Sequence, residues 1–259
     1  MQLKQQLLLL RRHALRLLPE WIWPVSVQLD GVSIPLRGRP WSYGTKWLLK
    51  QGGYEAEERA LMKGILQPGM QVLEMGSSIG ILTAIVAQKI GTAGRIVAVE
   101  ASQQLTRHSA AWLAAYPWVT IVTGFAFPVW KMGNIQIEGF SEVRGSLGGT
   151  VSFSSASNSP ASQTGSSGIY DIEKLCSTYK LQPQLLMVDV EGSERIMIDT
   201  PPALPACIRY IIMEIHPGMF ANGLKDRDAI VTSLANDGFA LDKEMRGVYL
   251  FERKGGGLG

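Results

Sequence analysis

QVLEMGSSIG, residues 71–80, is the stretch that decides the fold of this chain. An apolar run that contains a carboxylate, Glu74, leads directly into two glycines, Gly76 and Gly80, four residues apart. The run predicts a buried strand over 70–75, and the apolar residues beyond the glycines predict a helix over 79–91. A glycine turn between a strand and a helix is typical of a ligand-binding loop in an α/β sheet.

Further strands and helices follow this stretch in the order expected for such a sheet. Apolar runs predict strands at 95–100, 119–125, 184–190 and 208–215, and FALDKE with GVYLFER predicts a closing antiparallel pair. The first runs are apolar throughout, which is typical of parallel strands buried on both faces. We therefore predict an α/β fold with a doubly wound, mostly parallel seven-stranded sheet and helices on both faces.

The first fifth of the chain differs chemically from the rest. Residues 1–50 carry eight Lys or Arg against two Asp or Glu, and four of the seven tryptophans lie there. We predict a basic, Trp-rich extension over 1–53 with a helix and a hairpin, a main domain over 54–254 and a flexible tail over 255–259. Within the main domain, the serine-rich segment 149–168 predicts a mobile loop.

The extension bears on localisation and partners. Its longest apolar run is LLLL, too short to cross a bilayer, and Arg11 and Arg12 interrupt the place of a signal-peptide core. We expect a cytoplasmic protein, with two readings of residues 1–25. This basic segment either contacts the inner face of a membrane, or packs on the main domain or on a second copy in a homodimer.

The glycine loop favours one kind of ligand. It lacks the middle glycine of a dinucleotide loop, with Ser77 and Ser78 near that place, and it lacks the lysine of a P-loop. Glu74 would repel a phosphate and suits a cation. S-adenosyl-L-methionine fits, because it has no phosphate and carries an ammonium and a sulfonium. Gly76 then permits close approach of the backbone to the cofactor, or is simply a turn residue. Gly80 lets the helix that follows pack near the strand.

Two later strand ends extend this cofactor hypothesis. Glu100 ends the next strand, where an acid can accept hydrogen bonds from both ribose hydroxyls of an adenosine cofactor, unless it is only a surface carboxylate. Gly124 and Phe125 end the third strand, near the expected adenine. Phe125 either stacks on that ring or fills the core.

Five motifs together resemble the FkbM family of S-adenosylmethionine-dependent methyltransferases. They are YEAEE (54–58), VLEMGSSIG (72–80), VAVE (97–100), LLMVDVEGSE (185–194) and IIMEIHP (211–217). The resemblance implies the class I methyltransferase fold and methylation of hydroxyl oxygens on sugars, glycans or secondary metabolites. Two motifs depart from the family pattern: Met187 stands where a lysine is common, and the glycine motif reads E-x-G-S-S-x-G instead of D-x-G-A-N-x-G.

The ends of the fourth and fifth strands supply the candidate catalytic residues. Asp189, Glu191, Glu194, Glu214 and His216 are expected at one edge, where ligands of open α/β sheets bind. His216 is the predicted general base, since imidazole titrates near neutral pH, or else a histidine bonded to backbone. Asp189 is predicted to act in catalysis by contacting the cofactor or the acceptor hydroxyl. Glu191 is a further catalytic candidate and, with Glu194 and Glu214, is predicted to contact the acceptor. Glu194 is otherwise a charge at a helix start, favoured by the helix dipole.

A required metal is not predicted. Asp189, Glu191 and His216 are hard ligands on adjacent strand ends, but no ligand-spacing signature supports a metal site.

Other functions remain open from the sequence. An RNA methyltransferase is one, although DVEG stands where base-methylating enzymes usually carry [DN]-P-P-[YF]. A nicotinamide oxidoreductase is disfavoured by the missing glycine and by Glu74. A non-catalytic peripheral membrane or scaffold protein with this fold is the third. The preferred hypothesis is O-methylation of a saccharide, glycolipid or secondary metabolite.

Overall fold

A computed structural model describes residues 19–39, 41–132, 135–142, 149–155 and 168–255. The chain divides into two compact units, Met1–Ala56 and Glu57–Gly259. The boundary lies three residues beyond the predicted end of the extension. The predicted helix near the N-terminus and most of the predicted tail lie outside the described residues.

The first unit contains the predicted hairpin. Strands β1 (Ser26–Leu29) and β2 (Val32–Pro35) pair antiparallel. Asp30 and Gly31 between them are both left-handed, with φ of 48° and 87°, as a tight hairpin turn requires. The unit also holds η1 (Glu20–Ile22) and α2 (Tyr43–Lys50), a helix the sequence reading missed.

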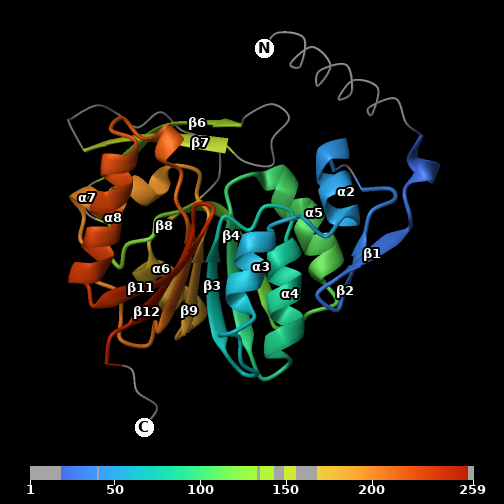
Figure 1. The fold of residues 1–259 in the computed structure, drawn as a ribbon, viewed down its shortest axis with the longest axis horizontal. Helices are drawn as coiled ribbons and strands as arrows, with labels where there is room; N and C mark the ends of the chain where they lie inside the picture. Colours follow the sequence, from blue (N-terminus) through green and yellow to red (C-terminus); the bar gives the residue numbers. More distant parts are fainter. Residues whose placement is uncertain (1–18, 40, 133–134, 143–148, 156–167, 256–259) are drawn as a thin grey trace. The chain divides into compact units, whose positions relative to one another are not determined.

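The second unit is built on one eight-stranded sheet (Figure 1). Its strands are β3 (Gln71–Met75), β4 (Arg95–Glu100), β5 (Val119–Ala126), β8 (Gly168–Tyr170), β9 (Leu185–Val188), β10 (Tyr210–Glu214), β11 (Phe239–Met245) and β12 (Val248–Arg253). The order is β11-β12-β10-β9-β3-β4-β5-β8, and only β12 runs antiparallel to its neighbours. The predicted fold class is confirmed; the predicted seven strands become eight because β8 adds to the edge at β5.

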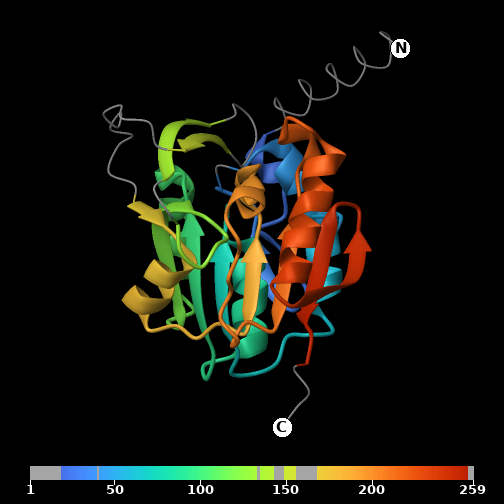
Figure 2. The ribbon, with the colours of Figure 1, turned by 90° about the vertical axis from the view of Figure 1, so that its left-hand side faces the viewer.

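Helices cover both faces of this sheet (Figures 1 and 2). Helices α3 (Ala56–Met62), α4 (Ile81–Ile90) and α5 (Gln103–Leu113) lie on one face, and α6 (Ile172–Tyr179), α7 (Ile196–Asp199) and α8 (Leu224–Asn236) lie on the other. Short 3-10 turns, η2 (Ser193–Arg195) and η3 (Pro217–Met219), follow β9 and β10. Because each strand alternates between two apolar layers, the sheet is buried on both sides, as the continuous apolar runs predicted.

The predicted mobile loop at 149–168 is partly wrong. Residues Gly149–Ser155 form β7, which pairs antiparallel with β6 (Ile135–Glu142), and Gly168 begins β8. The segment GTVSFSS contains Thr, Val and Phe, which favour strands, but its high serine content led to the prediction of a loop. Residues 156–167 lie outside the described part of the chain.

The position of β3 and β9 fixes where a ligand can bind. These two parallel strands are neighbours at the centre of the sheet. From β3 the chain proceeds to β4 and β5 on one side, and from β9 it proceeds to β10 on the other. The connections therefore diverge between β3 and β9 and leave a crevice at their carboxyl ends, the usual ligand site of an open α/β sheet.

Candidate functional site

The loop after β3 is held by backbone contacts that require its first glycine. The amides of Gly76 and Ser77 both donate to the carbonyl oxygen of Val99, at 2.9 and 3.0 Å. Gly76 has a φ of +86°, and a Cβ there would lie 1.7 Å from the carbonyl oxygen of Asp189. No side chain fits in that gap, so the loop after β3 and the residue after β9 touch only because position 76 is glycine.

The second glycine has a different role from the predicted one. Gly80 has a φ of +78° and precedes α4, and a Cβ there would lie 2.7 Å from Leu113 Cδ1 and 3.1 Å from Ser109 Cβ. Both neighbours belong to α5, so Gly80 allows α4 and α5 to approach each other rather than bringing a helix close to a strand.

Glu100 ties the loop to the end of β4. Its side chain is buried, with one carboxylate oxygen accepting from Ser78 N at 2.8 Å and the other from Ser102 N at 2.7 Å. Ser78 is left-handed, with a φ of 48°, which turns its amide toward this carboxylate. Glu100 is therefore an ordered acid at the edge of the loop and not a loose surface charge.

Glu74 lies below the loop instead of at the sheet edge. Its side chain is buried under α4, where burial raises its pKa to about 7. Three buried polar atoms at this point, Glu74 Oε2, Ser77 Oγ and Thr83 Oγ1, make no well-formed hydrogen bond with the described residues, although Thr83 is close enough to Glu74 to act against the rise of its pKa. Unsatisfied polar atoms are rare in protein interiors, and these fit a ligand that brings hydrogen-bonding groups to the start of α4. Thr83 was not predicted as a site residue.

Phe125 lies in the core, one of the two readings left open. It is buried in the apolar layer with Val122 and Phe127, and not at an open edge. A Cβ on Gly124 would lie 2.4 Å from the carbonyl oxygen of Gly168, so this glycine admits β8 beside β5. The extra strand was not predicted, and it pairs with the last residues of β5, near which an adenine was expected.

The five residues predicted for catalysis or acceptor binding come together at the ends of β9 and β10. Nδ1 of His216 lies 3.0 Å from Oε1 of Glu194, which is fully buried. Nε2 of His216 faces three carboxylates, at 3.7 Å from Asp189 Oδ1, 3.7 Å from Glu191 Oε2 and 3.6 Å from Glu214 Oε1. We call these five residues the acid cluster. In the described part of the chain, every ion pair of its carboxylates goes to His216.

The electrostatics of the acid cluster change the predicted role of His216. Burial alone would lower its pKa, but the hydrogen bond and charge of Glu194, together with Asp189 and Glu214, raise it to about 9. The imidazole is then protonated at neutral pH and is not a ready general base. Burial and the charge of Glu214 hold the pKa of Asp189 well above its usual range, and burial also raises that of Glu214.

Glu58, which sequence reasoning did not single out, extends this negative region. It is a buried residue of α3, and burial followed by the charge of Glu214 raises its pKa to about 7. Glu58 belongs to the YEAEE motif, and membership in that motif could have marked it as a site residue.

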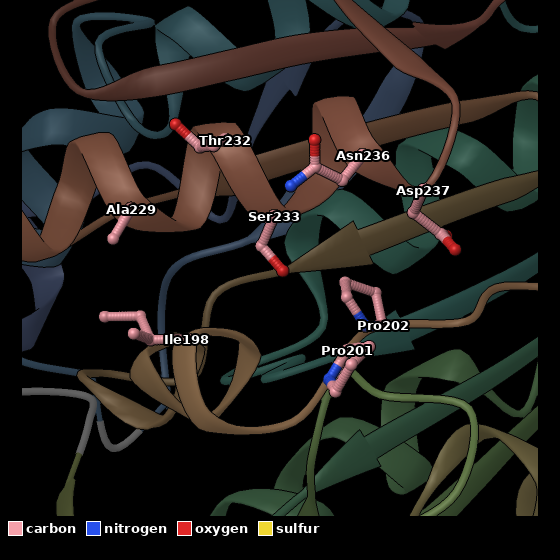
Figure 3. A pocket seen from close by; sticks show the side chains of 8 residues that line it. All are labelled: Ile198, Pro201, Pro202, Ala229, Thr232, Ser233, Asn236 and Asp237. Atoms are coloured by element: carbon pink, nitrogen blue, oxygen red, sulfur yellow. The ribbon is translucent and has the colours of Figure 1, made fainter.

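A cavity elsewhere does not compete with this site. It has a volume of about 600 Å³ and lies against the second half of α8 (Figure 3). Two polar groups in its wall are already used, since Ser233 Oγ donates to Met197 O and Asp237 Oδ2 accepts from Leu204 N. The end of α8 leads into the start of β11, so this cavity lies away from the carboxyl ends of the strands.

The strand order and this site define a class I methyltransferase fold. Around the central pair the order runs β5-β4-β3-β9-β10-β12-β11, with β12 as the one antiparallel strand inserted before β11. Enzymes of this class use S-adenosylmethionine as the methyl donor. In the chain, the loop after β3 and the acid at the end of β4 lie at the carboxyl edge of the sheet, where ligands of open α/β sheets bind.

Comparisons with known proteins agree with this class. Residues 51–123 match the family described as Protein-L-isoaspartate(D-aspartate) O-methyltransferase (PCMT). The match spans α3 to β5 and so covers the glycine loop and Glu100, but it ends before the acid cluster. No protein of curated function matches the chain.

Solved structures with a similar fold are distant in sequence. Fibrillarin from Aeropyrum pernix in complex with S-adenosyl-L-methionine is 12% identical, covers 76% of this chain and 74% of its own, and has a TM-score of 0.43. A TehB-like S-adenosylmethionine-dependent methyltransferase from Corynebacterium glutamicum is 11% identical, covers 82% and 96%, and has a TM-score of 0.44. None of these matches names the FkbM family, so that resemblance stays a prediction.

Proposed function

We propose that this chain transfers the methyl group of S-adenosylmethionine to a hydroxyl oxygen of a saccharide, glycolipid or similar polyhydroxylated metabolite. The observation that supports this most is the contact between Gly76 and Asp189. It joins the cofactor loop to the acid cluster, so a donor in the loop and an acceptor at the cluster would be neighbours. Proximity and alignment of this kind supply much of the acceleration in a displacement reaction.

The cofactor side is assigned to the loop after β3 and to Glu100. The carboxylate of Glu100 would bind the ribose hydroxyls. Ser77 and Ser78 would line the loop, and the unpartnered Oε2 of Glu74 would attract the positive end of the donor. S-adenosylmethionine supplies a sulfonium methyl, and the leaving sulfur takes the electron pair of the broken S–C bond.

The acceptor side is assigned to the acid cluster. Carboxylates accept hydrogen bonds from hydroxyls, and three of them converge within 3.7 Å of one imidazole nitrogen. As the new C–O bond forms, the hydroxyl proton would pass to a carboxylate, with Asp189 nearest the cofactor loop. This assignment moves the base role from His216 to Asp189, because His216 is already protonated at neutral pH.

The charge of the cluster argues against an anionic acceptor. The PCMT family, by its description, methylates isoaspartate, and that acceptor is a carboxylate. Here four carboxylates face one histidine, so an acceptor carboxylate would meet like charges. The match to that family also stops at residue 123, short of this region. A neutral polyol suits these residues better, in line with the FkbM resemblance, and a phosphate-rich RNA suits them less.

A methylation assay distinguishes these acceptors. The purified chain is incubated with methyl-labelled S-adenosylmethionine and a panel of free sugars, glycolipids, RNA and isoaspartyl peptide. Label in an alkali-stable methyl ether of a sugar would support the proposal. Label in an alkali-labile ester or in RNA would overturn the acceptor assignment.

We also propose that the first unit brings the enzyme to a membrane surface. Trp21, Val25, Trp47 and Leu48 are large apolar side chains that it exposes. No helix in the described ranges has the length and apolar character needed to span a membrane. A variant with Trp21→Ala and Trp47→Ala should lose sedimentation with anionic vesicles, whereas Leu241→Ala, exposed in the second unit, should not. Equal sedimentation of both variants would contradict this role.

A further inference from the structure

The acid cluster has a geometry that a hydrogen-bonded network does not explain. Each of its three outer carboxylates lies 3.6–3.7 Å from His216 Nε2, too far for a hydrogen bond. Candidate ligand atoms of Asp189, Glu214 and His216 all lie within 4.8 Å of one another. Around one cation with bonds of about 2.0–2.6 Å, two ligand atoms lie roughly 2.8–5.2 Å apart. The observed separations fall inside that range.

The support behind His216 fits a metal ligand. Glu194 is fully buried and lies 3.0 Å from Nδ1, on the far side of the ring from the outer carboxylates. A buried carboxylate on one ring nitrogen is the usual partner of a histidine that binds metal through the other. Glu194 Oε2 has no hydrogen-bond partner among the described residues, so the hydrogen bonding of this buried carboxylate goes to His216.

A second atom also lacks a partner. Asp189 Oδ1 is inaccessible to solvent and accepts no hydrogen bond from the described residues, although it faces Nε2. A buried carboxylate oxygen without a partner costs free energy that a bound cation would offset. The side chains of Asp189, Glu191 and Glu214 are about one third exposed, so the cluster remains open on one side to solvent and to an acceptor.

We propose that the acid cluster binds one divalent cation through Asp189, Glu214 and Nε2 of His216, where the cation replaces the proton of the metal-free imidazole, with Glu191 within reach. Carboxylates suit Mg²⁺, Ca²⁺ and Mn²⁺, and an imidazole shifts the preference toward a first-row metal such as Mn²⁺. The use of this ion rests on the proposed function: it would bind two neighbouring hydroxyls of the acceptor and favour loss of the proton from the attacking one to a carboxylate oxygen of the cluster that does not ligate the ion. This makes the acceptor a vicinal diol and departs from the expectation of a metal-free site.

Electron paramagnetic resonance with Mn²⁺ tests the site in the full chain. The expected result is about one tightly bound Mn²⁺ per chain, with a hyperfine coupling to an imidazole nitrogen that disappears in His216→Gln. Asp189→Asn should weaken Mn²⁺ binding at least about tenfold, whereas Asp242→Asn, an exposed acid on β11, should leave it unchanged. The nitrogen coupling is measured on the wild type, so the test remains valid even if a variant folds poorly.

Two results would overturn the site. One is no Mn²⁺ uptake by the wild type. The other is Mn²⁺ uptake that shows no nitrogen coupling and is unchanged in Asp189→Asn. Calorimetry with S-adenosylmethionine, run on the same sample, separates this outcome from failure of the proposed function. Cofactor binding without Mn²⁺ binding removes the metal site alone. Mn²⁺ binding without cofactor binding removes the proposed function and the diol role, and leaves the metal site.

Discussion

The carbonyl oxygen of Asp189 lies 1.7 Å from the position that a Cβ on Gly76 would occupy. The amide of Asp189 also donates to Met75 O at 2.9 Å, so the turns after β3 and β9 are joined on both sides of the glycine. Through this contact the loop assigned to the cofactor and the acid cluster assigned to the acceptor form one site. Predictions for the two halves therefore separate into effects on cofactor affinity and effects on turnover.

Gly76→Ala should abolish cofactor binding. The added methyl must displace the backbone at Asp189, and alanine is strained at a φ of +86°, so the loop cannot keep the shape assigned to cofactor binding. Gly64→Ala is the matched control, because nothing lies within 4 Å of a Cβ there and its φ is not left-handed. Calorimetric titration with S-adenosylhomocysteine checks this, and unchanged affinity in Gly76→Ala would contradict the placement of the cofactor.

Glu100→Gln should weaken cofactor binding by about 10- to 100-fold. The substitution removes the charge from two hydrogen bonds that hold the loop, and a bond to a charged group contributes about 1.5–3 kcal/mol. The melting temperature should also fall slightly. Glu252→Gln, an exposed acid on β12, should change neither quantity. If adenosine and S-adenosylhomocysteine bind Glu100→Gln as they bind wild type, this carboxylate does not contact the ribose.

Glu74→Gln should stabilise the fold while weakening cofactor binding. Its folded pKa of about 7 exceeds the unfolded value of 4.5, so its contribution to stability is fully present below pH 4.5 and is lost as pH rises through 7. At pH 8 the wild type should be less stable than the variant by an amount on the order of 3 kcal/mol. At pH 4 the two should converge.

Denaturant unfolding at both pH values measures this difference, and titration at pH 8 measures the cofactor affinity. A stability difference that is the same at pH 4 and pH 8 would show that Glu74 is not the titrating group. Higher stability with unchanged cofactor affinity would remove Glu74 from the site and leave it as a buried acid of the core.

Glu194→Gln should lower kcat by about 10- to 100-fold with little effect on cofactor affinity. Glu194 positions His216 from behind and touches neither the loop nor Glu100 in the described contacts, and loss of such a supporting carboxylate typically costs that much. Steady-state kinetics and a cofactor titration on one preparation test this. A parallel loss of cofactor affinity would instead indicate general disruption of the edge.

The β3–α4–β4–α5–β5 half of the sheet was readable from the sequence. Its strands are continuous apolar runs, and Gly76, Gly80 and Ser102 mark where the helices begin. The second half was less readable. Helix α8 carries only a weak apolar stripe, and β7 was obscured by its serines because local composition does not reveal strand pairing.

The candidate site divides in the same way. The members of the acid cluster were predictable because they follow parallel strands whose ends must meet at one edge. The raised pKa of His216 could not be predicted from the sequence, because it depends on carboxylates brought together from different strand ends and a 3-10 turn. The role of Glu74 in the cofactor site stays a prediction; its burial was not foreseen, because a carboxylate within an apolar strand points onto a face of the sheet and not toward the edge.

Calorimetric titration of S-adenosylmethionine into the purified full chain tests the central claim most directly. The account predicts one cofactor per chain, with affinity reduced in Glu100→Gln and lost in Gly76→Ala but retained in Glu194→Gln. Absence of cofactor uptake by the wild type, or uptake that both loop variants leave intact, would contradict it.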